Sequence, residues 1–269
     1  YYAPIFELAD VSKIAAYGTQ YDTNLVRFRG GKIWVDGSMS SGTPWVSQPH
    51  IDDPDNFGLH YFDLDALTEA VREAEAFGLP LKFHINGDAA VAATLDALET
   101  VDAEVGGLSH TPVLDHVVLT NAEDRNRMAA LGIVASVQPI HALTAKFGTS
   151  AEVWGDERYS LAYDSAALVD LGIPISLGTD WPVWPSPDTM PGLWAAVTVQ
   201  GEDSMTVKEA VRGFTAGGAE SIGSTEQGHL HPGGLADVVV YDSDLFETPM
   251  DKLQQIELLH LFVDGRKVH

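Results

Sequence analysis

Short apolar runs alternate with helix-like segments along most of the chain, and this alternation restricts the fold more than any other feature. In Asp63–Phe77 the apolar residues recur with a helical period of about 3.6, and Gly78 ends the pattern. Leu79–His84 follows at once as an apolar, strand-like run, and Ile133–Gln138 repeats the arrangement after a glycine. Strands that alternate with helices in this way predict βα units and a parallel sheet.

The other predicted elements keep the same order. We expect helices over Ala89–Glu99, Ala122–Leu131 (with Asn121 as N-cap) and Ser160–Leu171, and strands over Leu114–Leu119 and Ile173–Leu177. These make about five or six βα units, whereas a closed α/β barrel needs eight. An incomplete barrel exposes sheet edges, so something else should cover them.

The end of the chain has a different pattern. Val238–Tyr241 and Leu258–Val263 are two short strands with turn residues around them, and the second ends at Asp264-Gly265 before Arg266–His269. We therefore divide the chain into residues 1–223, a partial barrel, and residues 224–269, a small β segment, with the boundary near Gly223–Gly228.

Four polar residues close four separate strand-like runs. They are Lys32 in GGKIWVDGS, His84 in LPLKFHINGDAA, His116 in VLDHVVLT and Asp180 in IPISLGTDWPV. The carboxyl ends of parallel barrel strands form the active-site face. A lysine, two histidines and an aspartate at that face suit a divalent metal such as zinc, which predicts a metal-dependent hydrolase.

Each of these residues also has a purely structural interpretation. A lone buried histidine more often hydrogen-bonds a loop than binds a metal. Asp180 could cap the turn before Trp181, and Lys32 could form an ion pair with Asp36 or another acid. Asp36, Asp88 and Asp115 are weaker candidates, either as carboxylates that hold a ligand histidine or, for Asp88, as a helix N-cap, which we favour slightly.

The charge balance excludes some partners. With 39 acidic and 15 basic residues the formal net charge is −24, and nucleic acid or an anionic membrane surface would need basic patches that are absent. The sequence contains no run of about 18 apolar residues, so we expect no membrane span. There is no cysteine, which excludes disulfides and thiolate ligands. The sequence does not fix the compartment, although it slightly favours the cytoplasm.

Six motifs in order resemble the amidohydrolase superfamily, and more narrowly its amidohydrolase-3 branch of N-substituted formamide deformylase and exoenzyme-regulatory-like proteins. They are KIWVDGS (Lys32–Ser38), FHINGDAA around His84, LDHVVL around His116, GIVASVQPIHA (Gly132–Ala142), LGTDWPV around Asp180 and PGGLADVVVYD (Pro232–Asp242). Together they span nearly the whole chain.

The resemblance implies a (β/α)₈ barrel with a small β-sandwich built from both termini. It also implies that a His-x-His pair belongs on a first strand that is absent here, and that the chain is the C-terminal portion of a longer protein; it begins with Tyr1 rather than Met. The partners we expect are a small amide-type substrate and either the missing N-terminal portion or further copies of the chain.

The resemblance also implies a role for each strand-end residue. His84 and His116 would close the fifth and sixth barrel strands as ligands of one or two zinc ions, with other divalent metals as alternatives. Asp180 would bind the metal and move the proton of the attacking water. Lys32 would bridge two metals if carboxylated, which requires the neutral amine that burial favours. His141 and Trp181 are weaker candidates for substrate contacts.

Two functions of different class remain open. The intact protein would be a metal-dependent hydrolase of a non-peptide C–N bond, an amide or N-formyl group, and this chain alone would be largely inactive. Alternatively, it is a non-catalytic barrel remnant with a binding or regulatory role. A phosphotriester or lactone hydrolase would use the same ligands. The substrate depends on loops such as Gly37–Phe57 and Ala142–Asp156.

The dispersed acidic charge and scarce lysine suggest a protein from a salt-adapted source, with an ordinary acidic protein as the alternative. If salt screening offsets self-repulsion, the melting temperature rises between dilute buffer and molar KCl. Calorimetry or circular dichroism at both salt concentrations checks this, and an unchanged or lower melting temperature would contradict salt adaptation.

Overall fold

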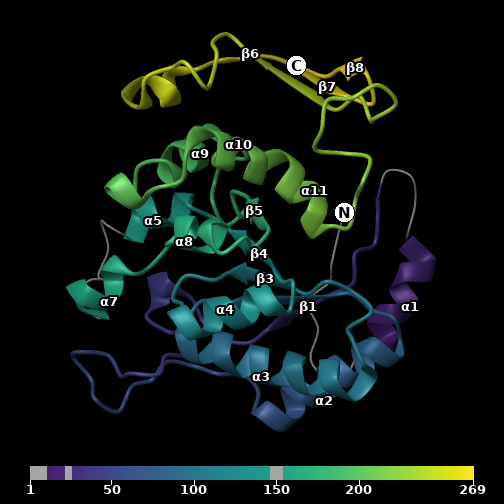
Figure 1. Cartoon of the computed structure of the whole chain (residues 1–269), viewed down its shortest axis with the longest axis vertical. Coiled ribbons are helices and arrows are strands. Elements are labelled where there is room, and N and C mark those ends of the chain that lie inside the picture. The colour runs from purple at the N-terminus through teal and green to yellow at the C-terminus, as the bar shows by residue number, and fades with distance from the viewer. Residues whose placement is uncertain (1–10, 22–25, 146–153) are drawn as a thin grey trace.

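Five parallel strands form the central sheet of the molecule, in the order β1-β2-β3-β4-β5 (Figure 1). The computed structural model describes residues 11–21, 26–145 and 154–269. The strands are β1 (Gly31–Trp34), β2 (Leu81–Ile85), β3 (Val113–His116), β4 (Val134–Val137) and β5 (Ile175–Leu177). Each pairs in parallel with the next strand along the chain, so their carboxyl ends meet at one edge.

One helix precedes β1, and others connect the strands or follow the last of them. They are α1 (Val11–Tyr21), α2 (Leu64–Ala76), α3 (Asp88–Val105), α4 (Ala122–Ala130), α5 (Ile140–Ala145), α7 (Asp156–Ser160), α8 (Ser165–Asp170), α9 (Met190–Ala196), α10 (Val207–Arg212) and α11 (Gly218–Ser221), with a π-helical stretch, η4 (Gly213–Gly217), between the last two. Short 3₁₀ turns are η2 (Met39–Ser41), η3 (Gly201–Asp203) and η5 (Met250–Gln255). In the described part of the chain no helix is long and apolar enough to span a membrane.

The register of the five strands produces two rows of side chains with opposite character. Ile33, Phe83, Leu114, Ala135 and Ile175 are aligned partners, and all are almost fully buried. The neighbouring row is Trp34, His84, Asp115, Ser136 and Ser176. Because successive strand residues point to opposite faces, one face of the sheet is apolar and the other is largely polar.

The apolar face carries the core. Its strand residues belong to one buried cluster with Leu67 and Val71 of α2, Leu95 of α3, and Met128 of α4. Figure 1 shows α2, α3 and α4 on one side of the strands and α9, α10 and α11 beyond β5. Parallel sheets normally bury apolar residues on both faces, so the polar row marks the face on which function is expected.

A second, antiparallel sheet follows at the end of the chain. It contains β6 (Val238–Tyr241), β7 (Leu258–Val263) and β8 (Arg266–Lys267) in that order. Asp264 and Gly265, both with positive φ, form the turn between β7 and β8, as their residue types predict. Leu253, between β6 and β7, is fully buried in the main core cluster. The division of the chain near residue 223 stays a prediction.

The sequence predicts most elements of the central sheet, and the deviations have local causes. The single helix expected over Ser160–Leu171 is wrong: Tyr163 has a φ of 62°, and Asp164 begins α8 anew by accepting a hydrogen bond from Ala167 N (3.1 Å). β3 ends at His116 because His116 and Val117 have φ values of 77° and 47°.

The helix after β2 also differs from its prediction at both ends. It runs on past Glu99 to Val105, where Gly106 adopts the left-handed conformation that ends it. Gly87 is its N-cap residue, so the cap predicted at Asp88 is wrong, and Asp88 instead accepts a hydrogen bond from Ser47 N at 3.0 Å.

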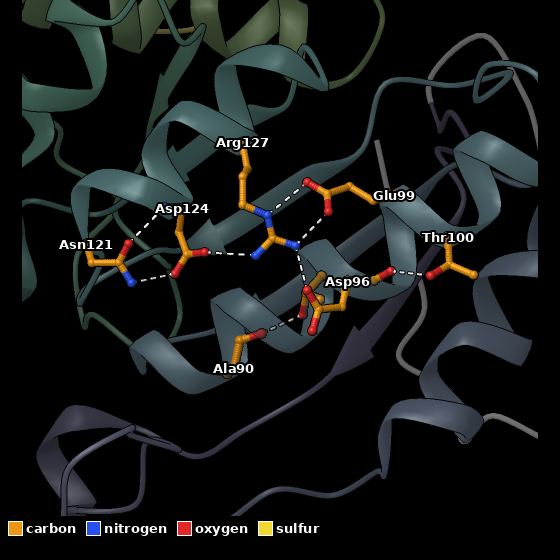
Figure 2. Close-up of polar contacts among 8 residues, drawn as sticks. Ala90, Asp96, Glu99, Thr100, Asn121, Asp124 and Arg127 are labelled. Carbon is orange, nitrogen blue, oxygen red and sulfur yellow. Dashed lines mark hydrogen bonds and ion pairs between the residues drawn. The ribbon is translucent and has the colours of Figure 1, made fainter.

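One arginine joins α3 to α4. Arg127 binds Glu99 through Nε and Nη2 (both 2.8 Å), Asp96 through Nη2 (2.6 Å) and Asp124 through Nη1 (3.0 Å), as Figure 2 shows. Asp124 is 3% exposed, and Asn121 donates to its other oxygen at 2.7 Å while capping α4. The hydrogen bonds from Arg127 hold the pKa of Glu99 below its ordinary value of 4.5.

Replacing Arg127 with alanine should lower the free energy of unfolding by about 2 kcal/mol at pH 7, because a buried carboxylate loses its cation. Since the pKa of Glu99 is depressed in the folded state, this contribution is present above pH 4.5 and lost as the pH falls below it. Urea unfolding of both proteins at several pH values measures the difference.

Arg72→Ala is the matched control. Arg72 bridges Glu69 and Glu104 in a similar way, but its side chain is 40% exposed, so we expect a smaller loss. Equal losses for the two variants would show that burial of Asp124 does not matter.

Candidate metal and catalytic site

Two histidines meet at the carboxyl ends of β2 and β3. The ring centroids of His84 and His116 lie 4.3 Å apart with the planes at 70°. Both side chains are buried, and burial lowers the pKa of His84 to about 3, with the charge of Lys32 adding to the effect. Burial lowers the pKa of His116 as well. Both rings are therefore neutral at pH 7, as metal binding requires.

The tautomer of His116 is set by Gln138, which directly follows β4. Gln138 Nε2 donates to Ser136 O at 3.1 Å, so its oxygen is the atom that faces His116 Nδ1 at 2.7 Å. That oxygen can only accept, so Nδ1 carries the proton and Nε2 keeps its lone pair. A ligand histidine is commonly held in this way through its other nitrogen. Gln138 directly follows the apolar run of β4, but the sequence prediction does not include it among the candidate residues.

The ring of His84 is held on several sides. It packs between Trp34, at a centroid distance of 4.4 Å, and His116. Its Nε2 lies 3.3 Å from Gly37 O and 3.1 Å from Asn86 Nδ2. In the tautomer that donates from Nε2 to the Gly37 carbonyl, Nδ1 keeps a lone pair for a metal.

Asp180 follows β5 in a left-handed conformation with a φ of 58°. Its Oδ2 lies 3.2 Å from Nε2 of His141, which comes from α5. Burial by itself would raise the pKa of Asp180, but the hydrogen bond with His141 and the positive charge of Lys32 hold it below its ordinary value. Asp180 is thus an ionised carboxylate, and Lys32 is near enough to act on it electrostatically. The side chain of the neighbouring Trp181 is 61% exposed.

Lys32 is the second residue of β1, so the prediction that it closes its strand is wrong, and its side chain points to an acid on β3. Its ammonium lies 2.7 Å from Asp115 Oδ2, and the two side chains are 20% and 9% exposed. The ion pair expected for a plain lysine therefore forms, with Asp115 as the partner rather than Asp36. Burial alone would raise the pKa of Asp115, but the positive charges of Lys32 and Lys82 and the hydrogen bond from Lys32 hold it below its ordinary value.

The structure does not gather the predicted ligands into one group. Within residues 11–21, 26–145 and 154–269, no three histidine, aspartate or glutamate side chains are arranged to hold a metal ion. The candidate residues form two pairs instead, His84 with His116 and Asp180 with His141. Their chemistry fits a divalent metal, since the imidazoles are neutral, the carboxylate is ionised and one tautomer is fixed. The roles of these residues stay predictions.

A cavity of about 700 Å³ lies among the loops at this edge of the sheet. It is lined by Ser47 from the loop after β1, by Asp88 and Leu119 from the segments after β2 and β3, and by Trp154 and Arg158 before and within α7. This volume suits a small molecule, but among the described residues that line it there is none of His84, His116 and Asp180, so the cavity lies next to the candidate site and not around it. Both loops predicted to shape the substrate site contribute to it, although residues 146–153 lie outside the described part of the chain.

The family of the chain follows from comparison with known proteins. A family model described as "Amidohydrolase family" (Amidohydro_3) matches residues 2–269. The chain belongs to the amidohydrolase family. The family predicted from the six sequence motifs is thereby confirmed.

Among individual amidohydrolase relatives, N-substituted formamide deformylase of Arthrobacter pascens is 25% identical over 274 residues, which cover 97% of this chain and 49% of the relative. Protein LONG AFTER FAR-RED 3 of Arabidopsis thaliana is 25% identical over 249 residues, covering 89% of this chain and 42% of that protein. The chain spans about half the length of the curated relatives it matches.

Solved structures show the fold. An uncharacterized metal-dependent hydrolase from Pyrococcus furiosus superposes with a TM-score of 0.77 at 24% identity, covering 87% of this chain and 50% of that one. An adenosine deaminase from Xanthomonas campestris with bound zinc gives 0.62 at 15% identity, covering 96% and 55%. The parallel α/β sheet predicted from the sequence is thus the sheet of metal-dependent hydrolases.

Replacing Lys32 with methionine tests the ion pair. The buried carboxylate of Asp115 loses its nearest cation, so its pKa should rise, and the free energy of unfolding should fall by about 3 kcal/mol at pH 7. Carboxyl-carbon NMR and urea unfolding measure the two effects.

Lys82→Met serves as the comparison, because Lys82 acts on Asp115 through charge and no hydrogen bond between them is present among the described contacts. It should shift the pKa of Asp115 less. Equal shifts in the two variants would count against a dominant Lys32–Asp115 bond.

Proposed function

We propose that this chain carries part of the active site of a metal-dependent hydrolase that cleaves a non-peptide C–N bond, in an amide or N-formyl group. The observation that carries the proposal is the pair of buried, neutral histidines at adjacent strand ends, one of them with its tautomer fixed by Gln138. Membership in the amidohydrolase family supports it, and so does the likeness to N-substituted formamide deformylase along nearly the whole chain.

In this proposal His84, His116 and Asp180 hold the metal, with Lys32 as a bridge if it is carboxylated. A bound divalent ion such as zinc supplies Lewis acidity, lowering the pKa of the attacking water to about 7 and polarising the carbonyl. Asp180 takes the proton from that water and delivers it to the leaving nitrogen. His141 keeps the Asp180 carboxylate ionised and oriented through its hydrogen bond to Oδ2.

The fold proposed for the whole protein is a (β/α)₈ barrel of which β1 to β5 form one part. Two features support it: the largely polar row on one face of the sheet, and the match to about half of each relative. The remaining strands would come from a longer polypeptide or from another chain. They would pair with the outer strands β1 and β5 and supply the His-x-His pair.

The first experiment is metal analysis of this chain and of the longest natural polypeptide that contains it. We expect one or two zinc equivalents in the long protein and little in this chain. The long protein should hydrolyse N-formyl or amide compounds, and Asp180→Asn should abolish turnover. Asp170→Asn, an exposed carboxylate at the end of α8, is the matched control and should leave turnover unchanged.

The outcomes separate the candidate functions. Retained turnover in Asp180→Asn would contradict the proposed role of Asp180. Absence of metal in both proteins, even after supplementation, would favour a non-catalytic barrel with a binding or regulatory role. Turnover of phosphotriesters or lactones in place of amides would move the reaction to the other class that uses the same ligands.

A further inference from the structure

A fully buried carboxylate lies beside the candidate site without being a predicted ligand. Asp36 follows β1, and its side chain has no exposed surface. Burial raises its pKa to about 7, although its backbone hydrogen bonds oppose the rise. A group so costly to bury calls for a specific reason.

Three backbone N–H groups converge on this carboxylate. Asn86 N donates to Oδ1 at 2.9 Å, and Gly87 N and Trp45 N donate to Oδ2 at 2.8 and 3.0 Å. Asp36 therefore ties the loop after β1 to the loop after β2. The loops are packed so closely that a Cβ on Gly87 would lie 1.8 Å from Trp45 O, so only glycine fits there.

The same connection ends at His84. The carbonyl of Gly37, the residue after Asp36, lies 3.3 Å from His84 Nε2. The side chain of Asn86, whose backbone Asp36 holds, donates to that carbonyl at 2.8 Å and lies 3.1 Å from the same Nε2. Asp36 thus holds in place both groups that contact Nε2 of His84, the Gly37 carbonyl and the Asn86 amide.

Packing fixes the plane of the His84 ring, but it does not fix which of the two ring nitrogens occupies which position. Because the ring of His84 lies between Trp34 and His116, its plane is set, but a ring flip or a change of tautomer would still exchange the roles of its two nitrogens. The Gly37 carbonyl accepts from Nε2 when that nitrogen carries the proton, whereas the Asn86 amide can donate to Nε2 only when it does not, so the relative positions of these two groups decide the tautomer and orientation of His84.

We propose that Asp36 is a positioning residue that fixes the orientation and tautomer of His84 through Gly37 and Asn86. Its relevance to catalysis rests on the proposed function, in which His84 holds the metal. Asp36 itself is no ligand, because its two oxygens already accept three N–H groups in a site closed to solvent.

The test starts with the metal-free chain, so that it does not depend on activity. In Asp36→Asn one oxygen becomes an NH₂ group that faces a backbone N–H, so the loop connection fails on one side. The ¹⁵N and ¹H signals of the His84 imidazole should shift toward the other tautomer or toward averaging. In the long protein the affinity for zinc should fall about 10- to 100-fold.

Two further variants keep the result interpretable. Asn86→Ala leaves the backbone N–H on Asp36 but removes the amide from His84, so it should move the His84 signals even if Asp36→Asn does not fold. Asp124→Asn alters a carboxylate that is buried to a similar degree, on α4, and should lower stability while the His84 signals stay in place.

Unchanged His84 signals in both Asp36→Asn and Asn86→Ala would overturn the proposal and leave Asp36 a purely structural residue. If the wild-type long protein binds no metal, the proposed function fails, yet the imidazole signals of the metal-free chain still decide the role of Asp36.

Discussion

In-register parallel pairing of β1 to β5 is the constraint on which the rest of the site depends. It aligns Trp34, His84, Asp115, Ser136 and Ser176 in one row across the sheet while the apolar partners pack on the helices. A shift of one residue in any strand would move its polar side chain into the core. The same apolar contacts that stabilise the sheet therefore set the position of the polar site.

Burial then determines the protonation states within the site. The histidines are neutral because their surroundings disfavour a charge and because Lys32 is already a cation nearby. Asp115 remains ionised although it is buried, because the ammonium of Lys32 lies 2.7 Å from its Oδ2. The site thus places neutral imidazole rings and ionised carboxylates a short distance apart. This is the condition for a metal ligand and a proton acceptor to act side by side.

Local sequence patterns account for the elements but not for the connections between them. Period and turn chemistry predict α2, β6 and β7, because each pattern is satisfied within a few residues. The break at Tyr163 was not predictable, because no glycine or proline signals it. The pairing of Lys32 with Asp115 likewise depends on which strands are neighbours.

The candidate site shows the same difference between features visible in one segment and contacts between distant segments. Strand-end position singles out His84, His116 and Asp180, since a polar residue after an apolar run is visible in one segment. The contacts that orient them are not visible in this way: Gln138 reaches His116 across 22 residues, and Asp36 reaches Asn86 across 50. Such contacts exist only once the sheet order is fixed, so a single sequence can nominate the ligands but not the residues that hold them.

The ion pair of Lys32 also bears on whether this lysine can bridge two metals. Reaction with CO₂ needs a free amine nitrogen, whereas in this structure the Lys32 nitrogen lies in an ion pair with Asp115 at 2.7 Å. Carboxylation would turn the group into an anion beside the Asp115 carboxylate, which is unfavourable unless cations separate the two. A bridging Lys32 is therefore consistent with this site only when metal arrives with the modification, and in the absence of metal the Lys32–Asp115 pair is the stable arrangement.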